Sequence, residues 1–546
     1  EDTPRQDKGL DLPEIQVTLG STSVRYGEVG FLPILSTTKR EAIGDTVTYL
    51  LKEHVIKGGG EYNDTSIDQI FKGNWRGVFI FTNKADFLAG NWSEYRQFGG
   101  VGGLSADEAG RAAFHQKELA FFLQDQWFVN PGLTITAGVR WESLNNPDDP
   151  ILNPFDQNPD GSFRLTGEIP DSDNQWSPRL GVAWSPDHQK TVVRLSVGRY
   201  WSRTPALLWA QPYTSNGVRG IQAIWRPGDP GAPDRGAAFN PVGVERANLS
   251  SGRSPCPGPL CGVFYVDPNF ENPYTDRVTL GAEREIAART FGSLTFTYAE
   301  GNQLQRLKDI NRVYDGTTAA NGLPRYSSTV FQYPYYGRIT TSVSDAESEY
   351  VGVTLNLQRR FADNLSFYAG GTWSQDRDHD SNERNFAGIQ AEDFNNLEGN
   401  WGYSDRDQRW RASASAVWDT PWWGIGLSGS FRYNTGQAYN ATANSDINND
   451  GVRETDRPTV DGRHFERNQF RQPDFYSLEA RISKGFRIGP GELKAFIECF
   501  NCTDAENRFV QNTQWGTGQT PNTGFGAETG VSPNPRTFQL AVRYDF

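Results

Sequence analysis

The feature that most constrains this chain is a series of strand-like segments joined alternately by tight turns and by long connections. One pair begins with LAFFLQDQWFV at Leu119, turns at NPG and returns as LTITAGVRWE, which ends at Glu142. In the returning segment, apolar residues from Leu133 to Trp141 alternate with small, polar or charged ones. This alternation is typical of a strand with one apolar face, and about ten residues suffice for a tilted strand to cross a bilayer.

The same geometry recurs along the chain. Further pairs occupy residues 43–51 with 54–63, 179–184 with 191–200, 277–285 with 292–300, 350–360 with 365–373, 411–418 with 424–433 and 476–486 with 492–500. The segments between pairs are long, rich in Asn, Asp, Gly and Pro, and show no helical period. Soluble domains rarely have so many irregular loops, whereas short periplasmic turns and long extracellular loops are the rule in outer-membrane barrels. We therefore predict an all-β fold, a transmembrane antiparallel β-barrel with about 16 or 17 strands in this chain, long extracellular loops and short periplasmic turns.

A soluble β-sandwich or propeller also contains alternating strands and turn signals. That alternative predicts shorter strands and gives no reason for aromatic rings at strand ends, which in a bilayer form the interfacial belts. Rings of this kind are Trp141, Trp184, Tyr200, Tyr298, Trp373, Trp418, Trp422, Trp423 and Tyr433. The barrel is therefore the preferred interpretation.

Composition excludes several other classes. Aromatic residues make up 13% of the 546 residues, so the chain is not disordered. The longest apolar runs, such as LAFFL, are far too short for a transmembrane helix. The net charge of −13 disfavours nucleic acid as a partner. The five histidines are scattered, and H-E-x-x-H, G-x-S-x-G and Walker sequences are absent, so we expect no enzymatic activity.

The chain ends in a strand pattern, RTFQLAVRYDF, that runs to its final residue. Its apolar or aromatic positions are Phe538, Leu540, Val542, Tyr544 and Phe546. Because backbone groups cannot stay unpaired in lipid, the sheet must close on itself and this strand must pair with the first. A final strand that ends on Phe resembles the signal by which the barrel-assembly machinery recognises outer-membrane proteins, so we predict a folding and targeting role for Phe546.

Several stretches resemble the TonB-dependent receptor superfamily, in particular its Oar-like branch with carboxypeptidase-regulatory-like N-terminal modules. They are FLQDQWFVNPGLTITAGVRWE, WSPRLGVAWSP, RYWSRTPALL, SDRDQRWRASASAVWDTP, YNTGQAYNATANSDINNDGVRETDRP and FYSLEARISKGFRIG. Their order covers the chain from about Phe31 to Phe546. The resemblance implies a barrel of about 22 strands filled by an N-terminal plug, with a TonB box that couples transport to the inner-membrane proton gradient.

The strand count falls short of that pattern, and residues 1–546 contain neither plug nor TonB box. We therefore expect residues 1–546 to be the C-terminal portion of a TonB-dependent receptor barrel, without the regulatory-like domain, the plug and the first strands. An unclosed sheet would leave two unpaired edges in lipid, so the native protein or another chain must supply the missing strands.

The resemblance implies a TonB-dependent active transporter or receptor in the outer membrane of a Gram-negative bacterium, for a large or scarce substrate. Its partners would be outer-membrane lipid, the TonB complex through the absent N-terminus, and the barrel-assembly machinery. The alternative is an outer-membrane structural or adhesion protein whose loops anchor an extracellular assembly, with a surface lipoprotein or other subunits as partners. A passive porin fits less well, because such a barrel without a plug leaves a wide aqueous hole.

The strongest local motif is DINNDGVRETD, residues 446–456. Asp446, Asn448 and Asp450, followed by a glycine, have the spacing with which an EF-hand-type loop begins to surround Ca²⁺. Calcium is the one candidate cofactor that the sequence suggests.

The motif departs from a calcium loop at its twelfth position. That position, normally an acid that binds through both oxygens, is Arg457, and Glu454 or Asp456 substitutes for it only imperfectly. A polar turn held by Asx hydrogen bonds is therefore the preferred interpretation, with calcium binding as the alternative.

Two cysteine pairs are close in sequence. Cys256 and Cys261 lie in a Pro- and Gly-rich segment without zinc ligands nearby, so a disulfide is the preferred interpretation and two free thiols are the alternative. Cys499 and Cys502 give only a weak metal signal, because no second pair of ligands accompanies them.

Other charged residues follow the strand pattern. The acids of SQDRDHDSNE, which are Asp376, Asp378 and Asp380, alternate on what we expect to be a solvated loop. Three arginines occupy polar strand faces and are expected to point into the barrel lumen: Arg140, Arg194 and Arg432.

Overall fold

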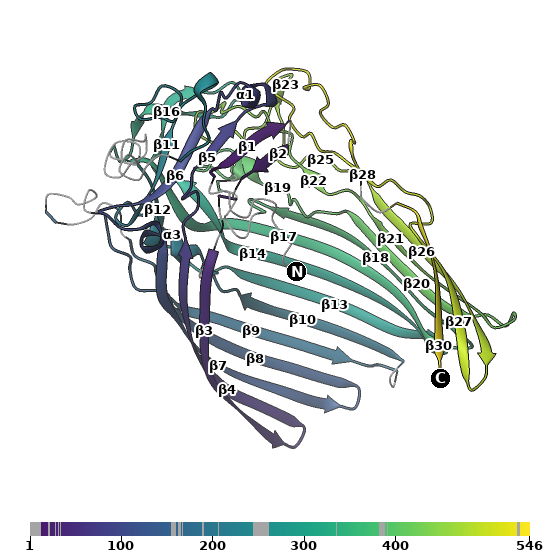
Figure 1. The fold of residues 1–546 in the computed structure, drawn as a ribbon. Coiled ribbons are helices and arrows are strands. Elements are labelled where there is room, and N and C mark those ends of the chain that lie inside the picture. Colours follow the sequence, from purple (N-terminus) through teal and green to yellow (C-terminus); the bar gives the residue numbers. More distant parts are fainter. Residues whose placement is uncertain are drawn as a thin grey trace.

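The alternating segments form one large, curved antiparallel sheet, the wall of a β-barrel (Figure 1). The computed structural model describes residues 12–546 except 20–21, 28, 31, 33, 154–159, 162–164, 166, 188–189, 206, 244–260, 335, 382–387, 390 and 532–534. The main strands pair with one another in chain order around the wall. They are β3 (Ile34–Leu51), β4 (His54–Phe71), β7 (Arg111–Asn130), β8 (Leu133–Asn145), β9 (Ser172–Trp184), β10 (Thr191–Trp201), β13 (Tyr274–Ala287), β14 (Thr290–Asp309), β17 (Tyr336–Ala362), β18 (Leu365–Asp378), β20 (Trp410–Asp419), β21 (Ile425–Asn434), β26 (Phe475–Ile488), β27 (Gly491–Phe500) and β30 (Thr537–Asp545). Two short strands, β12 (Cys261–Val266) and β19 (Gly402–Tyr403), join the same sheet where the long connections begin.

Every predicted hairpin is present, with its short turn at one end of the wall. One of several two-residue turns joins β3 to β4 through Lys52 and Glu53, and Lys52 takes the left-handed conformation that such a turn requires (φ 52°). At the other end several strands run further than predicted, and β17 reaches 27 residues. Since about ten residues cross a bilayer, the loop end of the wall stands well outside the membrane.

The outer face of the wall is apolar. Leu123, Leu355 and Leu540 are 58%, 62% and 78% exposed. A sandwich would bury such side chains between two layers, whereas a membrane barrel covers them with lipid. The soluble alternative is therefore excluded, and the membrane barrel is confirmed.

The inner face is polar and carries the three predicted arginines. Arg140 Nε lies 3.0 Å from Glu142 Oε1, and Arg194 Nη1 lies 3.7 Å from Glu283 Oε2. Arg432 shares this face, because its register partners are the serines of β20 and β26 while its neighbour Phe431 is exposed on the outer side. The wall itself thus supplies acidic partners for Arg140 and Arg194.

β3 and β30 stand at the two ends of this series of pairings. Although the sheet has the curvature of a closed barrel, the registers of the described residues join β3 to β4 and β30 to β27, and none joins β3 to β30. All 18 residues of β3 are exposed, and Figure 1 shows the two strands at opposite margins of the curved wall. The backbone groups along both margins need partners before the wall is stable in lipid.

The predicted long loops lie at one end of the wall, where they and the segment before β3 fold into a cap. Its largest part is a five-stranded sheet in the order β11-β6-β5-β1-β2. These strands are β1 (Glu14–Leu19), β2 (Thr22–Tyr26), β5 (Val78–Phe81), β6 (Glu94–Gly100) and β11 (Gly220–Trp225). Buried Phe79, Trp92 and Trp225 form its core. Figure 1 shows β1, β2, β5 and the helix α1 (Lys84–Leu88) gathered at the end of the wall opposite the short turns.

Smaller elements complete the cap. The helices are α1 (Lys84–Leu88), α2 (Ala106–Ala109) and α3 (Leu207–Thr214), with single 3₁₀ turns at Gly236–Ala238 and Glu398–Asn400. The strands are β15 (Arg312–Thr318), β16 (Pro324–Phe331), β22 (Ala438–Tyr439), β23 (Thr459–Val460), β24 (Arg463–His464), β25 (Phe470–Arg471), β28 (Arg508–Phe509) and β29 (Gly530–Val531). No helix in the described part of the chain has both the length and the apolar composition to span a bilayer.

Candidate functional site

Three long connections meet at one polar site on the loop end of the wall. Tyr326 comes from the connection between β14 and β17, Glu392 from that between β18 and β20, and Asn448 from that between β21 and β26. The Tyr326 N–H donates to the Asn448 carbonyl at 2.8 Å, and Asn448 Nδ2 donates to the Glu392 carbonyl at 2.6 Å. These bonds join segments that are far apart in the sequence.

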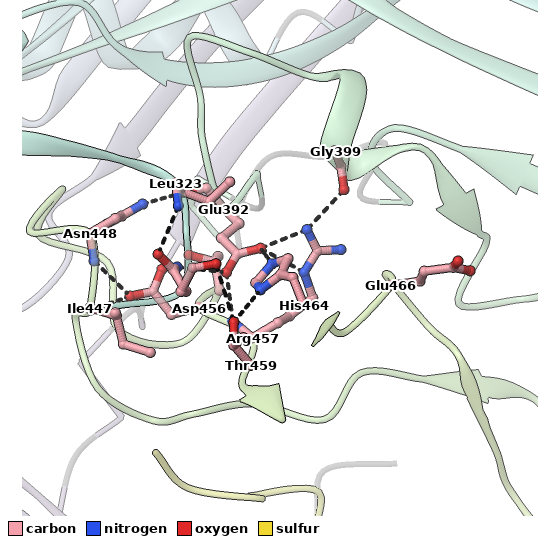
Figure 2. A network of polar contacts seen from close by, with 12 residues as sticks. Leu323, Glu392, Gly399, Ile447, Asn448, Asp456, Arg457, Thr459, His464 and Glu466 are labelled. Atoms are coloured by element: carbon pink, nitrogen blue, oxygen red, sulfur yellow. Dashed lines mark hydrogen bonds and ion pairs between the residues drawn. The ribbon is translucent and has the colours of Figure 1, made fainter. Parts of the chain in front are cut away.

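Glu392 is the centre of the site and is only 1% exposed. Its Oε1 accepts the Arg457 backbone N–H at 2.8 Å, and its Oε2 lies 2.6 Å from Arg457 Nη2. His464 Nε2 lies 2.8 Å from the same Oε2. Figure 2 shows Arg457 and His464 both directed at Glu392, while Arg457 Nη2 also donates to the Gly399 carbonyl at 2.9 Å.

A buried charge is costly unless it is paired and hydrogen-bonded. Burial by itself raises the pKa of Glu392, but the hydrogen bond with His464 and the charge of Arg457 outweigh it and hold the pKa below its usual value. Glu392 is therefore ionised at neutral pH, and the ion pair with Arg457 ties two external loops together.

A cavity of about 290 Å³ opens beside this ion pair. It is lined by Leu323, Glu392, Asp393, Asn396, Glu398, Gly399, Asn400, Arg457 and His464. The lining combines charged and amide groups with Leu323 and the aliphatic carbons of the longer side chains, so the cavity suits a ligand that presents both polar and apolar groups.

Residues 446–456 form a closed turn beside the ion pair. Its backbone N–H groups donate to side-chain oxygens within the turn. The Gly451 N–H donates to Asp446 at 2.9 Å, the Asp450 N–H donates to Asn448 Oδ1 at 3.0 Å, and the Ile447 N–H donates to Asp456. Figure 2 shows Asp456 folded back onto Ile447 and Asn448, and Gly451 permits the sharp turn (φ 88°). The Asx hydrogen bonds of the predicted polar turn are therefore present.

Two carboxylate oxygens of this turn have no hydrogen-bond partner: Asp450 Oδ2 and Asp456 Oδ1. Both residues are fully buried. Burial, together with the nearby charges of Asp456 and Asp446, raises the pKa of Asp450 to about 8. Burial and the charge of Glu392 raise the pKa of Asp456 to about 7. Among the described residues, no cluster of three or more His, Cys, Asp or Glu side chains forms a ready metal site.

The acids near the end of β18 are not solvated, contrary to the prediction. Asp378 and Asp380 are buried, and Asp378 Oδ1 lies 2.5 Å from Nη1 of the equally buried Arg467. The reason is that β18 continues to Asp378 and the connection between β21 and β26 packs over its end.

The two cysteine predictions have different outcomes. Cys256 and the side chain of Cys261 lie outside the described residues, so that disulfide stays a prediction. Cys499 and Cys502 are joined by a disulfide at the end of β27.

The C-terminal strand is present as predicted and pairs with β27. Its five apolar side chains are exposed: Phe538, Leu540, Val542, Tyr544 and Phe546. Their proposed part in barrel assembly stays a prediction.

The centre of the site was missed in the sequence. Glu392 is 65 residues from Arg457 and 72 from His464, and no local pattern marks any of the three as partners. The motif at 446–456 was the one sequence signal that pointed to this region, because Asn448 within it contacts Glu392 and Arg457 follows it directly.

Comparison with known proteins assigns the chain to a family. Residues 3–466 match the family described as "Outer membrane beta barrel domain". The chain belongs to this family. It is also 26% identical over 377 residues to the TonB-dependent transporter Oar of Myxococcus xanthus, a match that covers 65% of this chain and 32% of Oar. The chain thus spans about a third of the length of that curated relative.

Solved structures agree on the fold. The outer-membrane transporter YddB of Escherichia coli superposes with a TM-score of 0.53 at 11% identity, over 97% of this chain and 57% of YddB. The siderophore receptor PirA of Acinetobacter baumannii gives 0.50 at 10% identity, over 96% of this chain and 56% of PirA. Together these matches place the chain in the outer membrane: it belongs to the outer-membrane β-barrel family, is similar in sequence to a TonB-dependent transporter, and shares its fold with outer-membrane transporters and receptors.

Proposed function

We propose that this chain is the wall and external cap of an energy-coupled transporter that takes up a large or scarce substrate. The observation that carries the proposal is the cap itself, because connections from different strand pairs converge on the Glu392 site and the cavity beside it. A folded, cavity-bearing cap at the mouth of a barrel is suited to capturing a ligand before it passes through the wall. The relative Oar is a TonB-dependent transporter, which supports energy coupling here.

Genetics tests the coupling. In a growth condition where deleting this protein lowers uptake or fitness, deleting the TonB protein should reproduce the defect, and deleting both should add nothing. Uptake that persists without TonB would contradict the proposal.

We also propose that further strands complete the wall between β3 and β30, together with a plug that fills it. The support is that the registers end at these two strands and that lipid does not tolerate unpaired edges. Cysteines introduced at inward-facing positions of β3 and β30 should then stay unlinked in the native protein. Spontaneous disulfide formation between them would show that the two strands are neighbours and would refute this part.

A structural or adhesion protein is the second candidate. The five-stranded sheet with its own aromatic core favours it, because a rigid external module suits a docking role for a surface lipoprotein or another subunit. In that case, replacing the cap should abolish attachment or assembly, and deleting the TonB protein should have no effect.

A further inference from the structure

The turn at 446–456 carries an arrangement that its own hydrogen bonds do not explain. Asp450 Oδ2 and Asp456 Oδ1 are buried in fully covered residues and accept no hydrogen bond. Leaving one buried carboxylate oxygen unsatisfied is costly, and two in one turn compound the cost. Such oxygens need either a proton or a cation.

The other oxygen of each acid is already used within the turn. Asp450 Oδ1 accepts the Val452 N–H at 2.7 Å, and Asp456 Oδ2 accepts the N–H groups of Ile447 and Asn448. These bonds fix both carboxylates in place. The unpartnered oxygens therefore cannot rotate away to find other donors without breaking the turn.

The charges around the turn leave its acids without a full counter-charge. Arg457 and His464 are bound to Glu392 and are therefore committed elsewhere. Arg338 lies at the rim, where its Nη2 donates to the Gly451 carbonyl at 3.1 Å and its Nε lies 3.7 Å from Asp309. Arg312 lies beside it: its Nη2 is 3.0 Å from the position that a Cβ would take at Gly451, and its Nε lies 3.5 Å from Asp309 Oδ2. Two arginines thus face Asp309 and the three acids of the turn, and they do not neutralise all four.

We propose that this turn binds one Ca²⁺, with Asp450 Oδ2 and Asp456 Oδ1 as its anchoring ligands. Calcium accepts carboxylate, amide and backbone carbonyl oxygens in flexible geometry, and this turn offers such oxygens without a His or Cys ligand. Asp456, folded back onto the start of the turn, takes the part of the missing acid at the twelfth position. Arg338 at the rim weakens the site, so the expected Kd is about 10⁻⁴ to 10⁻³ M, the range of extracellular calcium modules.

The bound ion would stabilise the contacts that hold the loops of the cap together. Asn448 lies between Tyr326 and Glu392, so an ion held in the turn also steadies the contact among the three connections. Arg453, whose side chain is 45% exposed in the same turn, offers trypsin a cleavage site that reports on this order.

The test uses the full-length protein purified in detergent and titrated with CaCl₂ in a calorimeter, with MgCl₂ as the comparison ion. We expect one Ca²⁺ per chain and slower tryptic cleavage after Arg453 in Ca²⁺ than in EGTA. Asp450→Asn keeps the size of the side chain and removes its charge, so it should fold normally, lower the affinity at least about tenfold and make cleavage insensitive to EGTA.

Glu454→Gln is the matched control, because Glu454 is 66% exposed in the same turn and is not an anchoring ligand. It should bind Ca²⁺ as the native protein does. The proposal is overturned if titration of the native protein with CaCl₂ releases no heat of binding and Ca²⁺ does not slow cleavage after Arg453. It is also overturned if Asp450→Asn binds Ca²⁺ with native affinity, because Asp450 and Asp456 would then simply hold protons.

Discussion

Trp176 and Trp184 lie eight residues apart on the outer face of β9, and each is 50% exposed. Trp410 and Trp418 repeat this spacing on β20. At about 3.4 Å per residue and a tilt of about 40°, eight residues rise about 21 Å, close to the height of about 25 Å expected for a barrel's apolar band. The paired tryptophans thus mark the two membrane interfaces.

Between these belts, an arginine on the outer face should disrupt the barrel, and one on the inner face should not. Leu123→Arg places a charge on the lipid side of β7 between the two belts, at an expected cost of up to about 2–4 kcal/mol, the value for the middle of the bilayer. Gln124→Arg, on the adjacent inward-facing position, should cost less than about 1 kcal/mol. Urea unfolding of both variants in lipid vesicles measures the difference, and equal losses would contradict the assignment of faces.

The ion pair between Glu392 and Arg457 should stabilise the cap more than the wall. Arg457→Ala leaves a buried carboxylate without its main partner, which costs about 3–5 kcal/mol. Arg453→Ala, four residues earlier, removes an exposed pair with Glu454 worth less than about 1 kcal/mol. Hydrogen exchange resolved by peptide should show the loss in the cap only for Arg457→Ala, with the wall strands still protected in both variants.

The junction of β17 and β18 should loosen as the pH falls. His379 Nδ1 accepts the Glu347 N–H at 3.1 Å, and burial, reinforced by the charges of Arg306 and Arg467, lowers the pKa of His379 although Glu347 opposes this. The unfolded state then binds a proton at His379 more readily than the folded state does. The contribution of His379 to the free energy of unfolding is therefore complete above the unfolded pKa of about 6.5, and it is lost as the pH falls through the lower pKa of the folded state.

Amide protection at Glu347, corrected for intrinsic exchange, should therefore fall between pH 7.5 and pH 5. His379→Asn keeps an acceptor and cannot titrate in this range, so its protection should stay constant. A native protein that shows no pH response at Glu347 would contradict the lowered pKa.

The terminal ring should matter for assembly and not for the finished fold. Phe546 is 97% exposed, so Phe546→Ala removes little packing. We expect the amount of folded protein in the outer membrane to drop several-fold, while the refolded variant keeps the thermal midpoint of the native protein. Phe509→Ala, an exposed ring in an external connection, serves as the control and should lower neither quantity.

The wall could be predicted from the amino-acid sequence, because the signal for each of its hairpins is local. Alternation along Leu133 to Trp141 specifies two faces within one strand, and the NPG turn specifies its neighbour, so each hairpin is encoded within about 25 residues. The aromatic positions of β30 and the inward arginines followed from the same period of two.

The cap could not be predicted in this way, because its contacts join residues that are far apart in the sequence. Glu392 meets Arg457 and His464 across long stretches of chain, and Asp378 meets Arg467 in the same way, because strands far apart in sequence deliver their connections to one end of the barrel. The motif at 446–456 could be read as a polar turn in the sequence. Whether its acids are solvated or buried depends on which other loops cover it, and that burial is what turns Asp450 and Asp456 into candidate ligands.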